Sequence, residues 1–161
     1  TVVGQGPIGR TIVDRLNAFD VTTIGVRYTP SKGGPADEVI GFEDGELDEA
    51  LAETDHLVLA CPLTDLTADL VDEETLLLLP THATLVNVAR GEVVDTDALI
   101  DALRTNKIRG AALDVTAPEP LPADSPLWAL ENCHITPHNA GHTPRYWDRC
   151  AAIVETALSE L

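Results

Sequence analysis

The stretch that decides the fold is TVVGQGPIG, residues 1–9, in which a short β-branched segment leads directly into the glycine pattern G-x-G-x-x-G. Gly4 would permit a tight turn out of a strand, and Gly6 would let the backbone approach a pyrophosphate without a Cβ in the way. Gly9 would let the following helix pack closely against the sheet, and that helix would offer free N–H groups to the phosphates. The pattern therefore predicts a dinucleotide-binding turn, provided that a strand precedes it and a helix follows.

The rest of the chain supplies that context, because apolar strands alternate with helical segments along its whole length. This alternation is the signature of an α/β fold with a doubly wound parallel sheet of the Rossmann type. Asp95 stands where a helix cap is expected, and the Pro-rich residues 117–126 predict a loop. The predicted strands are residues 1–3, 21–26, 39–42, 56–60, 84–88, 110–115 and 134–136, and the predicted helices are residues 10–19, 47–51, 73–79, 96–104 and 145 onward.

Length and composition favour one globular domain over residues 1–161. The chain is 44% hydrophobic but only 4% aromatic, so its core must be built mainly from Val, Leu, Ile and Ala. No apolar run approaches the roughly 20 residues that cross a bilayer, and we expect no membrane association. A cofactor half alone makes a poor substrate pocket, so we expect the chain to be a fragment.

The net charge of −17 is the most unusual bulk property of the sequence. It argues against nucleic acid or an anionic membrane as a partner, because both need clustered Lys and Arg. Only Lys32 and Lys107 are lysines, and the acidic residues are spread along the chain. An acidic surface of this kind suits high salt, which screens its self-repulsion. We therefore predict a halophilic protein whose melting temperature rises with added KCl.

The cysteine pattern favours a reducing compartment. Cys61, Cys133 and Cys150 are odd in number and widely spaced, and they form no C-x-x-C pair. We expect no disulfide framework and a cytoplasmic location.

Three strand ends carry groups that could do chemistry, and strand ends face the ligand crevice of an open α/β sheet. Arg90 follows the strand at 84–88, and its planar guanidinium suits bidentate capture of a carboxylate. Glu119 stands in a stiff, Pro-flanked loop after the strand at 110–115. His138 follows the last predicted strand; a carboxylate on one ring nitrogen would orient the ring, leaving the other to exchange a proton with a carbonyl oxygen.

Other readings of the histidines are weaker. His138 and His142 are four residues apart, as in some metal sites, but no third ligand stands in a recognisable arrangement, and we expect no metal. A Ser/His/Asp hydrolase would need a G-x-S-x-G elbow, which the sequence lacks. His56 and His82 have no partner signature, and we interpret them as structural or solvent-facing.

The predicted helix from residue 145 onward has a broad apolar face. Two interpretations stay open: ordinary core packing, or docking against a second domain or another subunit. The face consists of Trp147, Cys150, Ile153, Val154, Ala157, Leu158 and Leu161.

Taken in order, several motifs resemble the D-isomer-specific 2-hydroxyacid dehydrogenase family, in its NAD(P)-binding domain. They are NVARGEVVD at 87–95, ALDV at 112–115, PEPL at 118–121 and TPH at 136–138, together with the glycine pattern and CPLT at 61–64. These motifs span nearly the whole chain. The resemblance implies that Arg90 anchors the substrate, that His138 is the acid/base and that Glu119 is its partner.

The resemblance also implies a set of cofactor contacts. Asp114 would hold the nicotinamide carboxamide, and His138 would lie beside the ring. The other implied contacts come from the glycine turn with Pro7 and Ile8, from Cys61, Pro62 and Thr67, from Val88 and Ala89, and from Gly141.

One departure from the family pattern bears on the choice of cofactor. Members that prefer NAD usually carry an acidic residue at the end of the second strand, where it bonds the ribose hydroxyls. Here that position holds Arg27, followed by Tyr28, Thr29 and Lys32. An arginine can stack on adenine and pair with a 2′-phosphate, which in so acidic a protein needs local cations. We therefore expect NADP, with NAD the less favoured cofactor.

The function implied is hydride transfer between a nicotinamide cofactor and a small 2-oxo or D-2-hydroxy acid, in a homodimer. Formate, phosphite and phosphoglycerate dehydrogenases of the same family are chemical alternatives. A cofactor-sensing corepressor-like binding module is the non-enzymatic one. In this family the substrate domain is built from segments before and after the cofactor domain. The resemblance therefore implies that residues 1–161 are the cofactor domain of a two-domain enzyme whose substrate domain is missing from this chain. Such an isolated domain should bind cofactor but turn over poorly, if at all.

Overall fold

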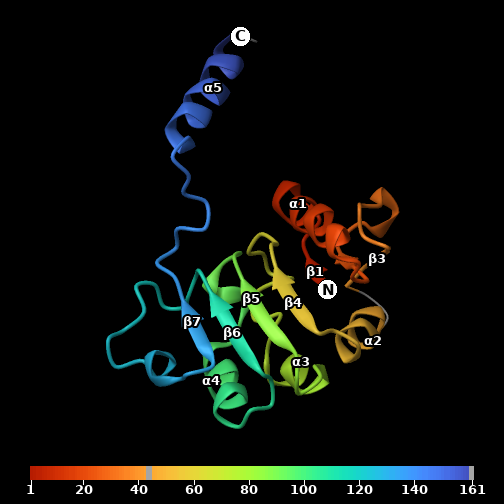
Figure 1. Cartoon of the computed structure of the whole chain (residues 1–161), viewed down its shortest axis with the longest axis vertical. Coiled ribbons are helices and arrows are strands. Elements are labelled where there is room, and N and C mark those ends of the chain that lie inside the picture. The colour runs from red at the N-terminus through yellow and green to blue at the C-terminus, as the bar shows by residue number, and fades with distance from the viewer. Residues whose placement is uncertain (43–44, 160–161) are drawn as a thin grey trace.

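The computed structural model describes residues 1–42 and 45–159, which form a seven-stranded parallel sheet flanked by helices (Figure 1). The strand order is β3-β2-β1-β4-β5-β6-β7, so the direction of winding reverses between β1 and β4. In open α/β sheets ligands bind outside the carboxyl ends of the strands at such a reversal. The strands are β1 (Val2–Val3), β2 (Ile24–Val26), β3 (Glu38–Ile40), β4 (His56–Leu59), β5 (Thr84–Asn87), β6 (Gly110–Leu113) and β7 (Cys133–Ile135).

The helices divide between the two faces of this sheet. On α1, Gly9 and Val13 are buried, and Gly9 faces the Val2 side chain of β1. Val3 points the other way and joins the main core, which α2, α3 and α4 cover. The helices are α1 (Pro7–Leu16), α2 (Glu46–Ala52), α3 (Glu73–Leu78), α4 (Thr96–Arg104) and α5 (Tyr146–Ser159), with 3-10 turns η1 (Asn17–Phe19), η2 (Pro30–Lys32), η3 (Gly91–Val93) and η4 (Pro126–Ala129).

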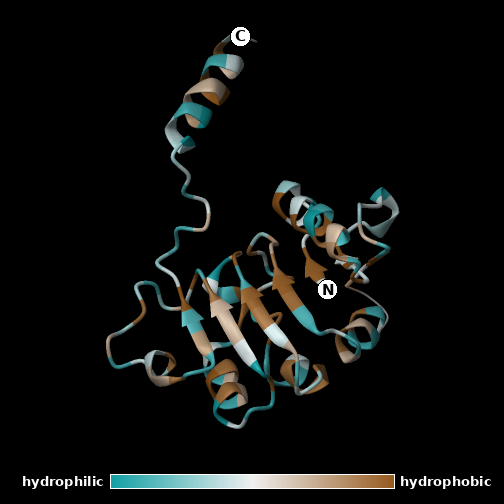
Figure 2. Cartoon of the chain, viewed as in Figure 1, coloured by the Kyte–Doolittle hydropathy of each residue, from teal (hydrophilic) through white to brown (hydrophobic). Residues whose placement is uncertain are grey.

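The central strands show the expected run of apolar side chains, visible as brown arrows in Figure 2. Leu57 and Leu59 of β4 and Leu85 of β5 are almost fully buried against the helices. Val58 and Val86 point to the opposite face and are half-buried. Burial on both sides is typical of a parallel sheet, and the predicted fold class is confirmed.

Element boundaries differ from the predicted ones by at most three residues, and α4 (Thr96–Arg104) matches its predicted range at both ends. The strand predicted at 21–26 covers only Ile24–Val26, because the Thr23 N–H and hydroxyl both bond the Asp37 carboxylate, at 2.8 and 3.0 Å. The strand predicted at 39–42 runs instead from Glu38 to Ile40.

The predicted cap of α4 is confirmed. Asp95 Oδ1 accepts hydrogen bonds from the N–H groups of Asp97 and Ala98, at 2.9 and 3.1 Å. Such a cap satisfies donors that the first helical turn leaves free.

The C-terminal helix α5 extends away from the sheet at the top of Figure 1. None of its described residues is buried, and Trp147, Ile153 and Leu158 are 80%, 69% and 65% exposed. Within the described residues the core-packing interpretation of its apolar face is therefore wrong, because no described element buries that face. Leu161 lies outside the described residues. Among those that are described, no helix has the length and apolarity of a membrane span.

Candidate active site

The glycine turn after β1 has the geometry that its sequence predicts. Gly4 has a φ of +98°, and a Cβ there would lie 2.6 Å from the Ala60 carbonyl oxygen. A Cβ on Gly9 would lie 1.7 Å from the Gly4 carbonyl oxygen, so the start of α1 packs directly on the turn. A Cβ on Gly6 would meet nothing within 4 Å. The turn is thus closed by protein on two sides and open at Gly6, where a pyrophosphate could approach.

A cleft of about 620 Å³ opens beside this turn, over the carboxyl ends of β1, β2 and β4. It collects most of the residues predicted to bind the adenosine part and the phosphates. Its lining includes Gly4, Gln5, Gly6, Arg27, Tyr28, Thr29, Lys32, Phe42, Cys61, Pro62, Thr64, Asp65 and Thr67.

A second hollow of about 400 Å³ continues the first toward β5, and the two share Ala60, Cys61 and Pro62. It adds Ile8 of α1, and the segment 88–90 after β5. Together the two hollows follow the sheet edge from the end of β2 to the end of β5. Pro7, Gly9, Asp114, His138 and Gly141 are not part of either lining.

The loop after β2 presents the basic residues. The guanidinium of Arg27 donates to the Gly33 carbonyl oxygen, which holds the loop against the end of the strand. Tyr28 is 81% exposed, and Lys32 is also exposed. Among the described residues that line the cleft, Asp65 is the single carboxylate, beside the two cations Arg27 and Lys32.

Cys61 and Thr67 form part of the cleft wall. Burial raises the pKa of the Cys61 thiol, so that it stays protonated at neutral pH. Thr67 is 4% exposed, and its hydroxyl donates to the Pro62 carbonyl oxygen at 2.7 Å and accepts from the Thr64 N–H at 2.8 Å. These bonds fix the turn that forms one wall.

Arg90 is exposed at the carboxyl end of β5, and a buried neighbour sets its backbone. Asn87 is 1% exposed; its amide donates to the Arg90 carbonyl oxygen at 2.9 Å and accepts from the Ala89 N–H at 3.0 Å. This role of Asn87 was not predicted from the sequence, although an amide that ends an apolar strand is a signal for it. The next residue, Gly91, brings two loops together, since a Cβ there would lie 2.1 Å from the Thr116 carbonyl carbon.

The predicted pairing of His138 with Glu119 is present. His138 Nδ1 lies 2.8 Å from Glu119 Oε1, with the two side chains 48% and 41% exposed. The pairing occupies Nδ1 and so leaves Nε2 as the ring atom that can exchange a proton. His138 has a φ of +51°, in the left-handed region that few non-glycine residues adopt.

Asp114, at the end of β6, is 7% exposed and bonds the segment that carries His138. Its Oδ1 accepts from the Thr136 hydroxyl at 2.5 Å and the Asn139 N–H at 3.0 Å, and its Oδ2 accepts from the Ala140 N–H at 2.9 Å. Burial alone would raise the pKa of Asp114, but these three bonds and the charge of His138 hold that pKa below its ordinary value. The carboxylate is therefore ionised at neutral pH.

The remaining histidines lie outside this constellation. His82 Nε2 pairs with Asp55 Oδ1 at 2.6 Å, and His56 Nδ1 lies 2.7 Å from the Thr84 hydroxyl; both histidines are exposed, as interpreted. The His142 ring contacts Tyr146 edge-on. Within residues 1–42 and 45–159, no group of three or more His, Cys, Asp or Glu side chains could hold a metal ion.

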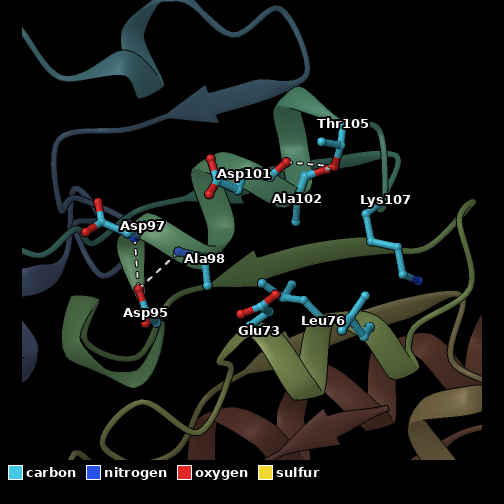
Figure 3. A pocket seen from close by; sticks show the side chains of 10 residues that line it. Glu73, Leu76, Asp95, Asp97, Ala98, Asp101, Ala102, Thr105 and Lys107 are labelled. Atoms are coloured by element: carbon cyan, nitrogen blue, oxygen red, sulfur yellow. Dashed lines mark hydrogen bonds between the residues drawn. The ribbon is translucent and has the colours of Figure 1, made fainter.

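Another hollow, of about 490 Å³, lies between α3 and α4 (Figure 3). Leu76 and Ala102 contribute to its apolar lining, while Asp95 on its rim is engaged in capping α4. It contains none of the predicted site residues and lies away from the glycine turn.

Comparison with known proteins identifies the kind of domain to which this sheet belongs. Residues 1–140 match the family model for the NAD binding domain of D-isomer specific 2-hydroxyacid dehydrogenases. The chain belongs to this family. A glyoxylate reductase of Pyrococcus furiosus is 42% identical over 157 residues, covering 98% of this chain and 46% of that protein. This chain spans about half the length of the curated relatives it matches.

Solved structures of the family superimpose closely on the domain. A phosphoglycerate dehydrogenase from Lactobacillus plantarum gives a TM-score of 0.84 at 36% identity, covering 90% of this chain and 46% of that one. A D-isomer specific 2-hydroxyacid dehydrogenase from Xanthobacter autotrophicus Py2, in complex with NADPH and MES, gives 0.79 at 39% identity, covering 85% and 43%.

Proposed function

We propose that this chain is the cofactor domain of an NADP-dependent dehydrogenase that reduces a small 2-oxo acid to the D-2-hydroxy acid. The observation that carries the proposal is the His138–Glu119 pair at 2.8 Å, on the same sheet edge as Arg90 and the glycine turn. Reduction of a 2-oxo acid needs a proton donor and a group that binds the substrate carboxylate, both beside the dinucleotide cleft. His138 and Arg90 would supply these two groups.

Each side chain then has one task. Arg90, exposed above β5, holds the substrate carboxylate through its paired N–H groups. Glu119 keeps the His138 ring oriented through Nδ1, and Nε2 gives its proton to the substrate oxygen. The nicotinamide, when bound, supplies the hydride to the keto carbon. The open side of Gly6 and the N–H groups that begin α1 would receive the pyrophosphate.

The preference for NADP is supported by the loop after β2. Arg27 and Lys32 line the same cleft as the glycine turn, and Tyr28 is free to stack on an adenine. The NADPH complex of the Xanthobacter neighbour is consistent with this preference. A charged hydrogen bond contributes about 1.5–3 kcal/mol, so loss of the Arg27 contact should weaken NADPH binding about 10- to 100-fold.

Calorimetric titration at high KCl tests the cofactor proposal directly on this chain. We expect NADPH to bind more tightly than NADH, and Arg27→Asp to reverse the order. Arg109→Asp is the matched control, because it changes the net charge equally and lies at the opposite, amino-terminal edge of the sheet. Tighter binding of NADH than NADPH by the unmodified chain would refute the preference for NADP.

The acid/base role needs turnover, so it is tested in an enzyme of full family length that carries this chain. His138→Gln should lower kcat by about 10²- to 10⁴-fold and leave the Kd of NADPH nearly unchanged. Near-normal turnover in that variant would remove His138 as the acid. Glyoxylate and 3-phosphoglycerate, named by the relatives, are the first substrates to compare.

Quaternary structure and location belong to the same proposal. We propose a cytoplasmic homodimer in which α5 lays its apolar face on a neighbouring domain. The apolar side chains of α5 are exposed in this chain, and Trp147, for example, is 80% exposed. Light scattering of this chain alone and of the full-length form distinguishes two modes of dimerisation. A dimer of this chain alone would show pairing through the cofactor domain. A dimer of only the full-length form would show that pairing needs the apolar face of α5 to be covered.

A further inference from the structure

We propose that Asp114 is a positioning residue for His138, holding the segment Thr136–Ala140 so that the imidazole meets Glu119 and faces the substrate. The inference rests on the proposed acid/base role of His138. It differs from the implied role of Asp114 as a ligand of the nicotinamide carboxamide, because here the carboxylate acts within the protein.

The carboxylate has most of its hydrogen-bonding capacity engaged. Two ionised oxygens accept about four hydrogen bonds, and the loop takes three of them. Oδ1 accepts two and Oδ2 accepts one, which leaves a single site on Oδ2 for a cofactor amide. In this structure Asp114 therefore mainly binds the loop on both sides of His138.

His138 needs such a restraint because of its backbone. Its φ of +51° is in the left-handed region, which a residue with a Cβ adopts only when its surroundings determine it. Inside the loop, the His138 N–H donates to the Thr136 carbonyl oxygen at 3.0 Å. The bonds from Asp114 to Thr136 before it, and to Asn139 and Ala140 after it, close the turn from both ends.

Asp114 is itself fixed to the other catalytic loop. Its N–H donates to the Asn87 carbonyl oxygen at 2.9 Å, and the Asn87 side chain holds the Arg90 backbone. The Thr136 N–H donates to the Leu113 carbonyl oxygen at 2.9 Å, next to Asp114 in sequence. One unbroken path of hydrogen bonds thus links the Arg90 segment, the end of β6 and the His138 segment.

The test compares variants that separate the two roles of Asp114. Thr136→Val removes one loop bond and leaves the carboxylate intact, and Thr136→Ser should restore it. Asp114→Asn removes the charge and one or more acceptor sites. Asp95→Asn is the matched control, since Asp95 also accepts two backbone N–H bonds but caps α4 outside the site.

The first readout is nitrogen-15 NMR of the chain without cofactor. In Asp114→Asn we expect hydrogen exchange at the Asn139 and Ala140 amides to accelerate about tenfold or more, and the ring-nitrogen signals of His138 to show loss of the Nδ1–Glu119 contact. Thr136→Val should move both signals in the same direction by less. Asp95→Asn should leave them unchanged.

The second readout is cofactor affinity and turnover. Thr136→Val should lower kcat in a full-length enzyme several-fold, with the Kd of NADPH unchanged, and Thr136→Ser should recover it. An Asp114→Asn variant with native amide exchange and native His138 ring-nitrogen signals, but weaker NADPH binding, would show that Asp114 is a cofactor ligand only and would overturn the inference. If Asp114→Asn does not fold, the Thr136 pair decides the matter.

The two proposals can fail separately. Failure of the unmodified chain to bind NADPH or NADH would refute the proposed function. The NMR signals of the unliganded chain would still show whether Asp114 holds His138.

Discussion

Replacing Gly6 by alanine separates cofactor binding from folding at the glycine turn. The backbone of Gly6 has φ −76° and ψ −173°, which alanine adopts freely, and its Cβ would meet nothing within 4 Å. Lower entropy of the unfolded chain should stabilise the variant by about 0.4–1 kcal/mol, while alanine is a poorer helix cap than glycine by a similar amount. The two effects nearly cancel, and for a domain of this size the melting temperature should move by less than about 3 °C.

Binding should respond very differently. The added methyl group stands on the open side of the turn, where the pyrophosphate must approach the N–H groups that begin α1. Loss of one charged hydrogen bond is worth about 1.5–3 kcal/mol, so the Kd of NADPH should rise about 10- to 100-fold. Gly9→Ala is the contrasting variant, because its Cβ would lie 1.7 Å from the Gly4 carbonyl oxygen and should prevent normal folding.

The assay pairs differential scanning fluorimetry with calorimetric titration on the same preparations. A Gly6→Ala chain that melts normally and binds NADPH as tightly as the unmodified chain would refute the placement of the pyrophosphate. A chain that melts much lower would instead show that Gly6 packs against protein.

Three further predictions concern other parts of the molecule. Gly91→Ala should lower the melting temperature by about 2–12 °C in scanning fluorimetry, because its Cβ would lie 2.1 Å from the Thr116 carbonyl carbon and must push two loops apart; an unchanged melting temperature would contradict that contact. In a thiol titration at pH 8, Cys150 on the open helix α5 should react first; Cys61 and Cys133 should be slow, because burial raises both pKa values, that of Cys133 to about 11. Equal rates for all three would show that the core opens readily. The melting temperature should rise with KCl, since among the described residues one arginine, Arg104, pairs with a carboxylate within 4.0 Å (Asp101, at 3.9 Å), against a net charge of −17. A flat salt response would refute the halophilic interpretation.

Local pattern accounts for most of what the sequence predicted correctly. The fold class follows from the alternation of apolar strands and helices. The glycine turn follows from steric limits, because a Cβ on Gly4 or Gly9 would clash with nearby backbone. Strand ends were less certain, as Thr23 illustrates: its N–H bonds the Asp37 carboxylate, 14 residues away, and so leaves β2 shorter than predicted. The apolar face of α5 could not be assigned, since periodicity gives the face of a helix but not its partner.

By itself, the sequence determined the order of the strands along the chain, the glycine turn and the chemical types of Arg90, Glu119 and His138. Only the tertiary structure decided that Glu119 and His138 meet at 2.8 Å, and that Asn87 and Asp114 set the backbone around them. The reason is physical: these bonds join neighbouring strand ends, and their partners come together only when the parallel register of β5, β6 and β7 is fixed by the packing of the whole sheet.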